Sequence, residues 1–581
     1  MYQSLEVNRM GRTAVLLVVW LGLSIPPVLG QFSLGVAAGE SSSGVGEFWT
    51  RADEPGPVQL VVATDAGVTQ TVAAIFATAD QARDNTVLVQ LAGLAPATDY
   101  YYQFRSGSAI GPFTDPQRTG DASFVSAVGR LRTAPPPDAA AAARFVFTGD
   151  SNFAFAPMTA MGLTARENAD LFIWFGDTIY SDVSAAGLGR ARTLADYRAK
   201  YRQMFGDAGV QAALAATTLL VGWDDHEVAN DYAGNDPALD REQQTAGYTA
   251  FFEYMPIRPQ NVAGEPFRLY RRIPYGANAE FFLLDARQYR DASAEGVCGG
   301  SLDPLGALSG PILRDPACID ELDADRSMLG REQLDWLKQS LLDSTASLKF
   351  VINNVPMSFI GVFPYDRWDG YDRERRELLE FIDQNCIVGV VVLTTDIHAS
   401  AYNPDLAHYF RVHRPDYRLR NGIVVREVIV GPIGNATARQ SIAGIGASFF
   451  GGGDLVEAAV GESTDQAAAD GRSALLDGLV GFFENSLVLA NNLDFIELNR
   501  LSYVVIDMHP DGGATLTWRG ITPEESQAGA TTPATIFETQ IPPNPSPGSA
   551  ALPCFAPVLL VVSGLMSAIC GRRSASERFT G

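Results

Sequence analysis

The chain is poor in cationic residues, and its few cysteines follow no pattern of a zinc site. Its 581 residues include 43 Lys and Arg against 67 Asp and Glu, which gives a net charge of −24. Nonspecific binding of nucleic acid requires a cationic surface, so this composition argues against a nucleic-acid partner. The five cysteines lack the spacing of zinc ligands. An anionic substrate would therefore need a local positive centre, most simply a bound metal ion.

Both ends of the sequence carry an apolar segment. Residues 1–30 combine a polar, Arg-containing lead with the run TAVLLVVWLGL, which predicts a secretory signal peptide. The alternative, a short membrane anchor, is disfavoured because the run is too short to span a bilayer comfortably. Residues 551–573 are apolar and end on two arginines, which predicts a C-terminal membrane anchor before a polar tail at 574–581. We therefore expect a secreted or cell-surface protein, tethered to a membrane, with most of the chain outside the cytoplasm.

The use of cysteine fits export. Cys298 and Cys318 flank a Gly- and Pro-rich loop, and a disulfide between them is the simplest account in an oxidising compartment. Cys386 lies beside the apolar run IVGVVVL and is predicted to be a buried small hydrophobic residue.

The sequence is long enough for roughly three domains. Residues 31–133 contain short apolar runs separated by turn signals, which predicts a small β-sandwich of immunoglobulin or fibronectin type. A Pro- and Ala-rich linker is predicted at 134–143. In residues 144–525, apolar runs such as DLFIWFGD and VGVVVLTTD alternate with possible helices, which indicates an α/β domain. A hairpin with its turn at 510–513 could close a sheet edge, and residues 526–550 are predicted to be a Pro-rich linker.

Four predicted strands of the α/β domain each deliver an acidic residue at the carboxyl end. These residues are Asp150, Asp177, Asp225 with His226, and Asp396 with His398. Because α/β sheets place their ligand crevice at the carboxyl ends of the strands, we expect these side chains to meet. A single Asp in such a place is more often a helix cap or a turn residue. Four together, two of them paired with His, favour a metal centre, since carboxylates and imidazoles are common metal ligands.

Longer motifs around these residues resemble a known family. The motifs are GDTIYSD at 176–182, WDDHEVAND at 223–231, WDGYDRERRELLEF at 368–381 and TDIHAS at 395–400. In order and spacing they resemble the PhoD-like branch of the metallophosphoesterases, and the region before them resembles the N-terminal fibronectin-like domain of that family. The resemblance implies that the α/β domain is a sandwich of β-sheets flanked by helices.

The resemblance also implies roles for individual residues. Asp177 would bridge two metal ions, Tyr180 would offer a phenolate to ferric iron, and the other metal ligands would be Asp225, Asn230, Asp396 and His398. His226 would stand near the leaving group as an acid. Such a centre binds phosphate oxygens and activates water, so the implied activity is hydrolysis of phosphomonoesters or phosphodiesters. Iron and calcium are the metals that the family implies.

Two positions leave alternatives open. Many members of the family have Cys where this chain has Asp150, and a hard carboxylate ligand there would admit manganese, magnesium or zinc in place of iron. Asp150 could instead only shape the turn after its strand. Arg287, in LLDARQYR, could bind the substrate or could form only a structural ion pair with Asp285.

A second class of function also fits the sequence. The β-sandwich could be the working part of a surface adhesion or carbohydrate-contact protein, in which the metal centre is only structural. His226 separates the two hypotheses, because a structural metal site needs no acid beside the metals that is not itself a ligand. The sequence predicts no oligomeric state.

Overall fold

The computed structural model describes residues 32–544, apart from 41, 108–123, 261, 295–323, 361–365 and most of 443–490. The predicted signal peptide, C-terminal anchor and polar tail lie outside the described residues, and so do Cys298 and Cys318. Within the described ranges, no helix has the length and apolar character needed to cross a membrane.

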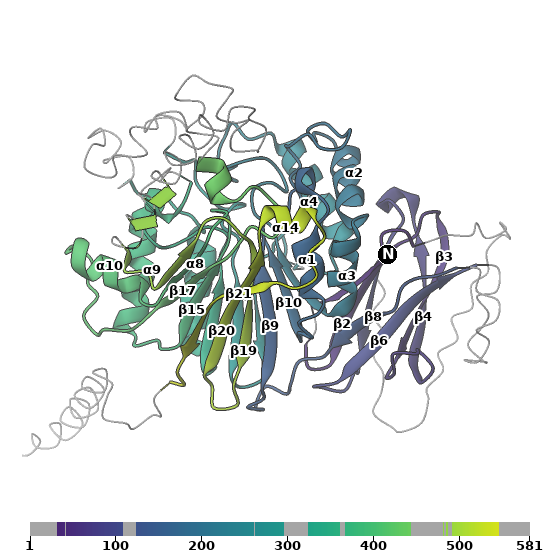
Figure 1. The fold of residues 1–581 in the computed structure, drawn as a ribbon, viewed down its shortest axis with the longest axis horizontal. Helices are drawn as coiled ribbons and strands as arrows, with labels where there is room; N and C mark the ends of the chain where they lie inside the picture. The colour runs from purple at the N-terminus through teal and green to yellow at the C-terminus, as the bar shows by residue number, and fades with distance from the viewer. Residues whose placement is uncertain are drawn as a thin grey trace, which may run out of the picture.

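Two β-sheets pack face to face in the centre of the molecule, and helices cover their outer faces (Figure 1). The nine-stranded sheet has the order β21 (Ala534–Ile541), β20 (Ala514–Ile521), β19 (Leu501–Met508), β9 (Ala143–Thr148), β10 (Leu171–Phe175), β11 (Thr218–Gly222), β1 (Val36–Gly39), β2 (Val45–Arg51) and β5 (Thr86–Ala92). The seven-stranded sheet has the order β12 (Arg271–Tyr275), β13 (Ala279–Leu283), β14 (Leu348–Ile352), β15 (Val390–Thr394), β17 (Arg426–Ile429), β16 (Ser400–Asn403) and β18 (Phe495–Glu497). The predicted α/β fold with a sandwich of sheets is confirmed.

Each sheet has its own set of helices. Those packed on the nine-stranded sheet are α1 (Thr159–Thr164), α2 (Leu194–Phe205), α3 (Ala208–Ala216) and α4 (Arg241–Tyr254). Those packed on the seven-stranded sheet are α8 (Arg331–Asp343), α9 (Asp372–Gln384) and α10 (Leu406–His413). The shorter helical segments are α14 (Pro523–Gln527), η1 (Gln81–Arg83), η2 (Phe153–Phe155) and η4 (Trp368–Tyr371).

Strand β10 shows why the central strands are continuous apolar runs. Its side chains point alternately to the two faces of the sheet, as in any strand. Phe172 and Trp174 pack in the core beneath the helices, whereas Leu171, Ile173 and Phe175 pack in the core between the two sheets. Because both faces of the strand are buried, every position is apolar.

The N-terminal β-rich region is continuous with the central sheet. Its outer sheet contains β4 (Thr71–Ala79), β3 (Gly56–Ala63), β6 (Asp99–Ser106), β7 (Phe124–Val125) and β8 (Gly129–Arg132). The facing strands β1, β2 and β5 extend the nine-stranded sheet, since β1 pairs in parallel with β11 through Ala38 opposite Thr218. One sheet of the predicted β-sandwich is therefore also the end of the central sheet, and no helix or strand lies between β8 and β9.

Two details differ from the sequence predictions. The segment predicted as a linker at 526–550 contains β21, which pairs along β20, because ATIFETQI is rich in β-branched residues and the prolines Pro533 and Pro542 lie only on either side of it. Cys386 is half-buried and disulfide-bonded, so it is not simply a small hydrophobic residue. The predicted hairpin is formed by β19 and β20.

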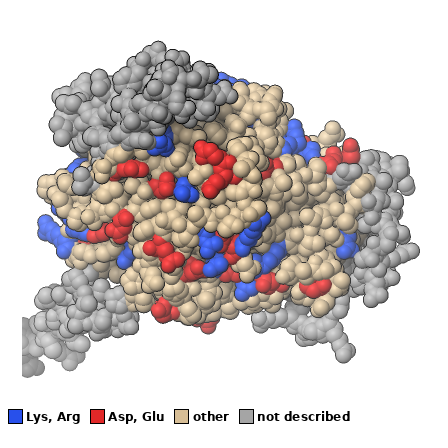
Figure 2. Space-filling model, viewed as in Figure 1, with Lys and Arg blue, Asp and Glu red and all other residues tan. Residues whose placement is uncertain are grey.

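Charged side chains of both signs mix on the surface. On the face shown in Figure 2, Lys and Arg side chains lie among Asp and Glu side chains. The chain as a whole has a net charge of −24, so its surface disfavours polyanions except where a local positive centre exists.

Candidate active site

The ends of four strands bring the predicted acidic residues together. Strands β9, β10 and β11 are parallel neighbours, so Asp150, Asp177 and Asp225 follow at the same edge of one sheet. Asp396 follows β15 of the other sheet, and its backbone N–H donates a hydrogen bond of 3.2 Å to Oδ1 of Asp150. Gly149 permits this approach, because a Cβ there would lie 2.8 Å from Cγ2 of Thr395, the residue before Asp396.

The backbone is strained at this edge. Five non-glycine residues have left-handed backbone conformations, with φ of 60° at Asp150, 50° at Asp177, 56° at Asp231, 73° at Asp396 and 54° at His398. Each such conformation costs roughly 1–3 kcal/mol and persists where the surrounding structure holds it, which is common at functional sites. These backbone conformations direct the short polar side chains toward one another at the strand ends.

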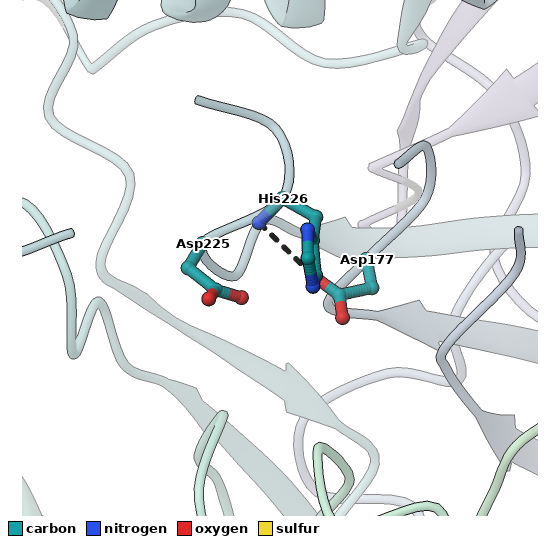
Figure 3. A group of neighbouring side chains, drawn as sticks. All are labelled: Asp177, Asp225 and His226. Carbon is teal, nitrogen blue, oxygen red and sulfur yellow. Dashed lines mark hydrogen bonds between the residues drawn. The ribbon is translucent and has the colours of Figure 1, made fainter. Parts of the chain in front are cut away.

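Asp177, Asp225 and His226 form a group that could hold a metal ion. Each offers a donor atom, and the three atoms lie within 4.8 Å of one another. Figure 3 shows the imidazole ring of His226 between the two carboxylates. The backbone N–H of His226 also donates to Oδ1 of Asp177 at 3.2 Å, which ties the loop after β11 to the loop after β10.

The charges at this edge are poorly balanced by the protein alone. Burial, together with the neighbouring carboxylates Asp396 and Asp224, raises the pKa of Asp150 well above its usual range. Burial and the carboxylates of Asp225 and Asp224 raise the pKa of Asp177 in the same way. Buried oxygen atoms of Asp150 and Asp224 have no hydrogen-bond partner. Buried carboxylates with unsatisfied oxygens are costly unless a cation joins them, so this donor set fits metal ions.

Tyr180 and His398 complete one side of the cluster. The Tyr180 hydroxyl lies 2.9 Å from Nε2 of His398, and the amide nitrogen of Asn435 lies 3.3 Å from the same atom. Burial and the charges of Asp177 and Asp150 raise the pKa of Tyr180, so a phenolate there requires a cation. Burial, helped by nearby His226, lowers the pKa of His398 to about 4, which leaves a neutral imidazole of the kind that binds metals.

His226 is held by a carboxylate that the sequence predictions did not include. Nδ1 of His226 lies 2.6 Å from Oδ1 of Asp182, and Oδ2 of Asp182 accepts the backbone N–H of Asn230 at 3.1 Å. The ring of His226 stacks on that of Tyr180, with centroids 3.9 Å apart. Burial opposes protonation of His226, but Asp225 and Asp182 together raise its pKa to about 9.

The loop that carries Asp225 and His226 is fixed from behind. The carboxylate of Glu227 accepts the backbone N–H and the hydroxyl of Thr178 at 2.5 and 2.6 Å, and the N–H of Asp224 at 2.9 Å. The carbonyl of Val228 accepts hydrogen bonds from Tyr197 on α2 and from Gln243 on α4. Glu227 in the WDDHE motif is therefore a structural clamp between the two loops.

Arg287 is a buried counterion in this structure. Its side chain is 0% exposed; it donates to Asp224 and binds Asp366 at 2.7 and 3.3 Å. Its Nη2 lies 3.7 Å from oxygens of both Asp225 and Asp396. The guanidinium thus faces carboxylates in this structure, and the substrate contact of Arg287 stays a prediction. The predicted pairing with Asp285 is also not the main one, because Asp285 instead accepts the backbone N–H of Arg287.

The structure also separates one predicted ligand from the cluster. The Asn230 side chain is exposed, and its backbone N–H contacts Asp182.

Residues that the predictions missed but that contact the site are Asp182, Asp224, Asp366, Arg367 and Asn435. Arg367 lies 3.2 Å from Oδ2 of Asp396 with 15% of its side chain exposed. Asp182 ends the GDTIYSD motif and Asp224 lies within WDDHE, so these two had a signal in the sequence, whereas Asp366 had none.

The chain is similar to known phosphatases. Residues 145–460 match the family model of the PhoD-like phosphatases, and residues 27–135 match that of the PhoD-like phosphatase N-terminal domain. Alkaline phosphatase D of Bacillus subtilis (strain 168) is 32% identical over 406 residues, which are 64% of this chain and 64% of that protein. The chain therefore aligns with slightly less than two thirds of this relative.

Solved structures agree on the fold. A structure of PhoD superposes with a TM-score of 0.65 at 24% identity and covers 91% of this chain and 95% of that chain. Purple acid phosphatase PPD1 from yellow lupin (Lupinus luteus) seeds reaches a TM-score of 0.48 at 11% identity, covering 89% and 74% of the two chains, a likeness too weak to support an argument. The family models cover both the N-terminal region and most of the central sandwich, and the motifs at the strand ends lie within them. The chain belongs to the PhoD-like phosphatase family.

Proposed function

We propose that this protein is an extracytoplasmic, metal-dependent hydrolase of phosphomonoesters or phosphodiesters. The observation that carries the proposal is the cluster of buried carboxylates at the strand ends, with unsatisfied oxygens on Asp150 and Asp224 and with His226 beside it. Family membership and the similarity to alkaline phosphatase D support the same reaction class.

In this proposal, seven predicted positions divide into ligands and an acid. The residues that would hold the metal ions are Asp150, Asp177, Tyr180, Asp225, Asp396 and His398, while His226 would serve the leaving group. When bound, the metal ions would supply a nucleophile from water and neutralise phosphate oxygens. Iron and calcium are the metals suggested by the family, and manganese, magnesium or zinc are compatible with a hard carboxylate at Asp150.

The protein's own groups then have three tasks. The carboxylates would hold the metal ions at the strand ends. Arg287 and Arg367 offset part of the negative charge that the carboxylates bring, through contacts with Asp224 and Asp396. Burial opposes protonation of His226, but Asp225 and Asp182 raise its pKa to about 9. His226 would therefore hold the proton that a departing alkoxide needs.

Export is part of the proposal and rests on the sequence pattern of residues 1–30. The apolar segment at 551–573 would keep the enzyme at the outer face of a membrane.

One experiment tests reaction and location together. Purified full-length protein should hydrolyse 4-nitrophenyl phosphate or bis(4-nitrophenyl) phosphate, and a chelator should abolish this until metal is restored. Intact cells that express the protein should hydrolyse the same charged esters, because these do not cross a membrane freely. As a control, Asp138→Asn removes an exposed charge that precedes β9, whereas Asp150 follows that strand, and this variant should behave as wild type. Metal-replete protein that hydrolyses neither ester would refute the proposed reaction and favour a purely structural metal centre.

A further inference from the structure

We infer that Arg367 is a specificity-determining residue, whose guanidinium binds the terminal phosphate oxygen that a monoester has and a diester lacks; this inference rests on the proposed function. Arg367 directly precedes η4, in the sequence DRWDGYD at 366–372. Every other residue of that stretch is buried, whereas 15% of the Arg367 side chain is exposed. The stretch therefore presents a single cationic group that solvent can reach.

The backbone at Arg367 is held in place by its neighbours. Trp368 is 0% exposed and packs in the core between the seven-stranded sheet and its helices. The backbone N–H of Gly370 donates to the carbonyl of Arg367 at 2.9 Å, which closes the turn at the start of η4. The guanidinium therefore extends from a fixed point of the chain.

The two acidic residues nearest to Arg367 in the sequence have other cationic partners. The carboxylate of Asp366 accepts a hydrogen bond from Arg290 at 2.7 Å. The carboxylate of Asp369 accepts one from Arg375 at 2.8 Å. Both carboxylates are buried, and their charges are balanced by these arginines. Arg367 is therefore not required to neutralise either of them.

Arg367 contacts the strand-end acids through Asp396. Its Nε lies 3.2 Å from Oδ2 of Asp396, and the backbone N–H of Asp396 donates to Asp150. In the proposed function Asp396 would hold a metal ion, and a bound metal ion is commonly the largest charge in its surroundings. The carboxylate would then share its charge with that ion. The guanidinium would be attracted more strongly to a further anion beside it.

Exposure distinguishes Arg367 from Arg287, a second arginine beside Asp396. Nη2 of Arg287 lies 3.7 Å from Oδ1 of Asp396, and the Arg287 side chain is 0% exposed. Arg367 approaches the other oxygen, Oδ2, and the side chains of Arg367 and Asp396 are 15% and 13% exposed. A phosphate group that approaches from solvent therefore meets Arg367 first.

The chemistry of the guanidinium favours a monoester. Its planar fork of N–H donors matches the oxygens of a phosphate group, and such charge-assisted hydrogen bonds are strong. A phosphomonoester dianion has three terminal oxygens and two negative charges, so it can serve both metal ions and a guanidinium. A phosphodiester has only two terminal oxygens and one negative charge. Arg367 should therefore contribute more to the recognition of a monoester than to that of a diester.

The competing role for Arg367 is that of a counterion only. In that role, its removal would take positive charge away from Asp396 and from nothing else. The metal content or the melting temperature would then change, and hydrolysis of both classes of ester would change by the same factor. The two roles therefore differ in measurable ways.

Two esters with the same leaving group separate these roles. Wild type, Arg367→Gln and Arg367→Lys are assayed on 4-nitrophenyl phosphate, a monoester, and on bis(4-nitrophenyl) phosphate, a diester. Arg331→Gln is the control, because Arg331 also pairs with carboxylates but 61% of its side chain is exposed. Binding of inorganic phosphate to each metal-loaded protein is measured by titration calorimetry. Metal content and melting temperature are measured for every variant.

We expect Arg367→Gln to lower kcat/KM on the monoester by roughly 10- to 100-fold, the range for a hydrogen bond to a charged group. The loss on the diester should be no more than about threefold. Inorganic phosphate, which carries the same terminal oxygens as the monoester, should bind roughly 10- to 100-fold more weakly. Arg367→Lys should lie between Arg367→Gln and wild type, because it keeps the charge but loses the planar fork. Metal content should stay near wild type.

Several results would overturn the inference. Equal losses on both esters, or loss of metal with unchanged affinity for phosphate, would make Arg367 a counterion. A wild-type enzyme that hydrolyses only the diester would also contradict it. If the melting curve shows that Arg367→Gln is unfolded, Arg367→Lys provides the same comparison. Failure of the proposed function is a separate outcome, since wild type would then hydrolyse neither ester, and the phosphate titration would still test the contact.

Discussion

Replacing Arg287 with methionine should destabilise the protein far more than removing an exposed arginine. Arg287 is 0% exposed and donates to two carboxylates, Asp224 and Asp366, whose side chains are 1% and 8% exposed. Methionine fills a similar volume but leaves Asp224 without its cation, while Asp366 keeps its contact of 2.7 Å with Arg290. The main cost is therefore one buried carboxylate that has lost its partner.

The size of the destabilisation follows from the loss of this one ion-pair partner. Breaking a buried ion pair by removing one partner costs about 3–5 kcal/mol. Unfolding entropy of about 2 cal/mol/K per residue, taken over a chain of this size, converts that cost into a fall in melting temperature of roughly 2.5–4 °C. Bound metal should reduce the fall, because a cation takes over part of the charge that Arg287 balances.

Thermal melting with and without metal is the assay, and Arg331→Met is the matched control. Arg331 also contacts two carboxylates, Asp335 and Glu377, but 61% of its side chain is exposed, so its loss should cost no more than about 1 kcal/mol. A melting temperature that stays at the wild-type value in Arg287→Met, together with a raised KM, would refute this reasoning and make Arg287 a substrate contact.

Two further predictions concern the metal and the N-terminal region. Asp150→Ala should lose about one metal ion per chain by elemental analysis and most of the activity. Asp150→Cys should keep some activity, with its metal preference shifted toward iron or zinc, because a soft ligand then replaces a hard one. Full metal content in Asp150→Ala would make Asp150 a turn residue. Deletion of residues 32–133 should give insoluble protein, because it removes β1 from its pairing with β11 and exposes the edge of the central sheet. A soluble, active fragment would show that the N-terminal region is an independent module.

The sequence alone determined the features that depend on local pattern. Apolar runs with an acid at the end identified β9, β10, β11 and β15, because a strand buried on both faces is apolar over most of its length and the acid follows where the strand ends. The motifs at these ends carried the family resemblance. The turn after β19 was also visible, since its Pro, Asp and Gly residues are turn formers.

Only the tertiary structure decided which side chains meet. His226 and Asp182 are 44 residues apart, and Arg287 is 63 residues from Asp224 and 79 from Asp366, so no spacing in the sequence pairs them. The extension of the central sheet by β1 and the addition of β21 at its other edge likewise depend on which strand offers a free edge. The local sequence pattern determines whether a segment becomes a strand. Contacts between distant segments depend instead on the packing of the whole sandwich. These contacts hold His226 and the counterion Arg287 in place.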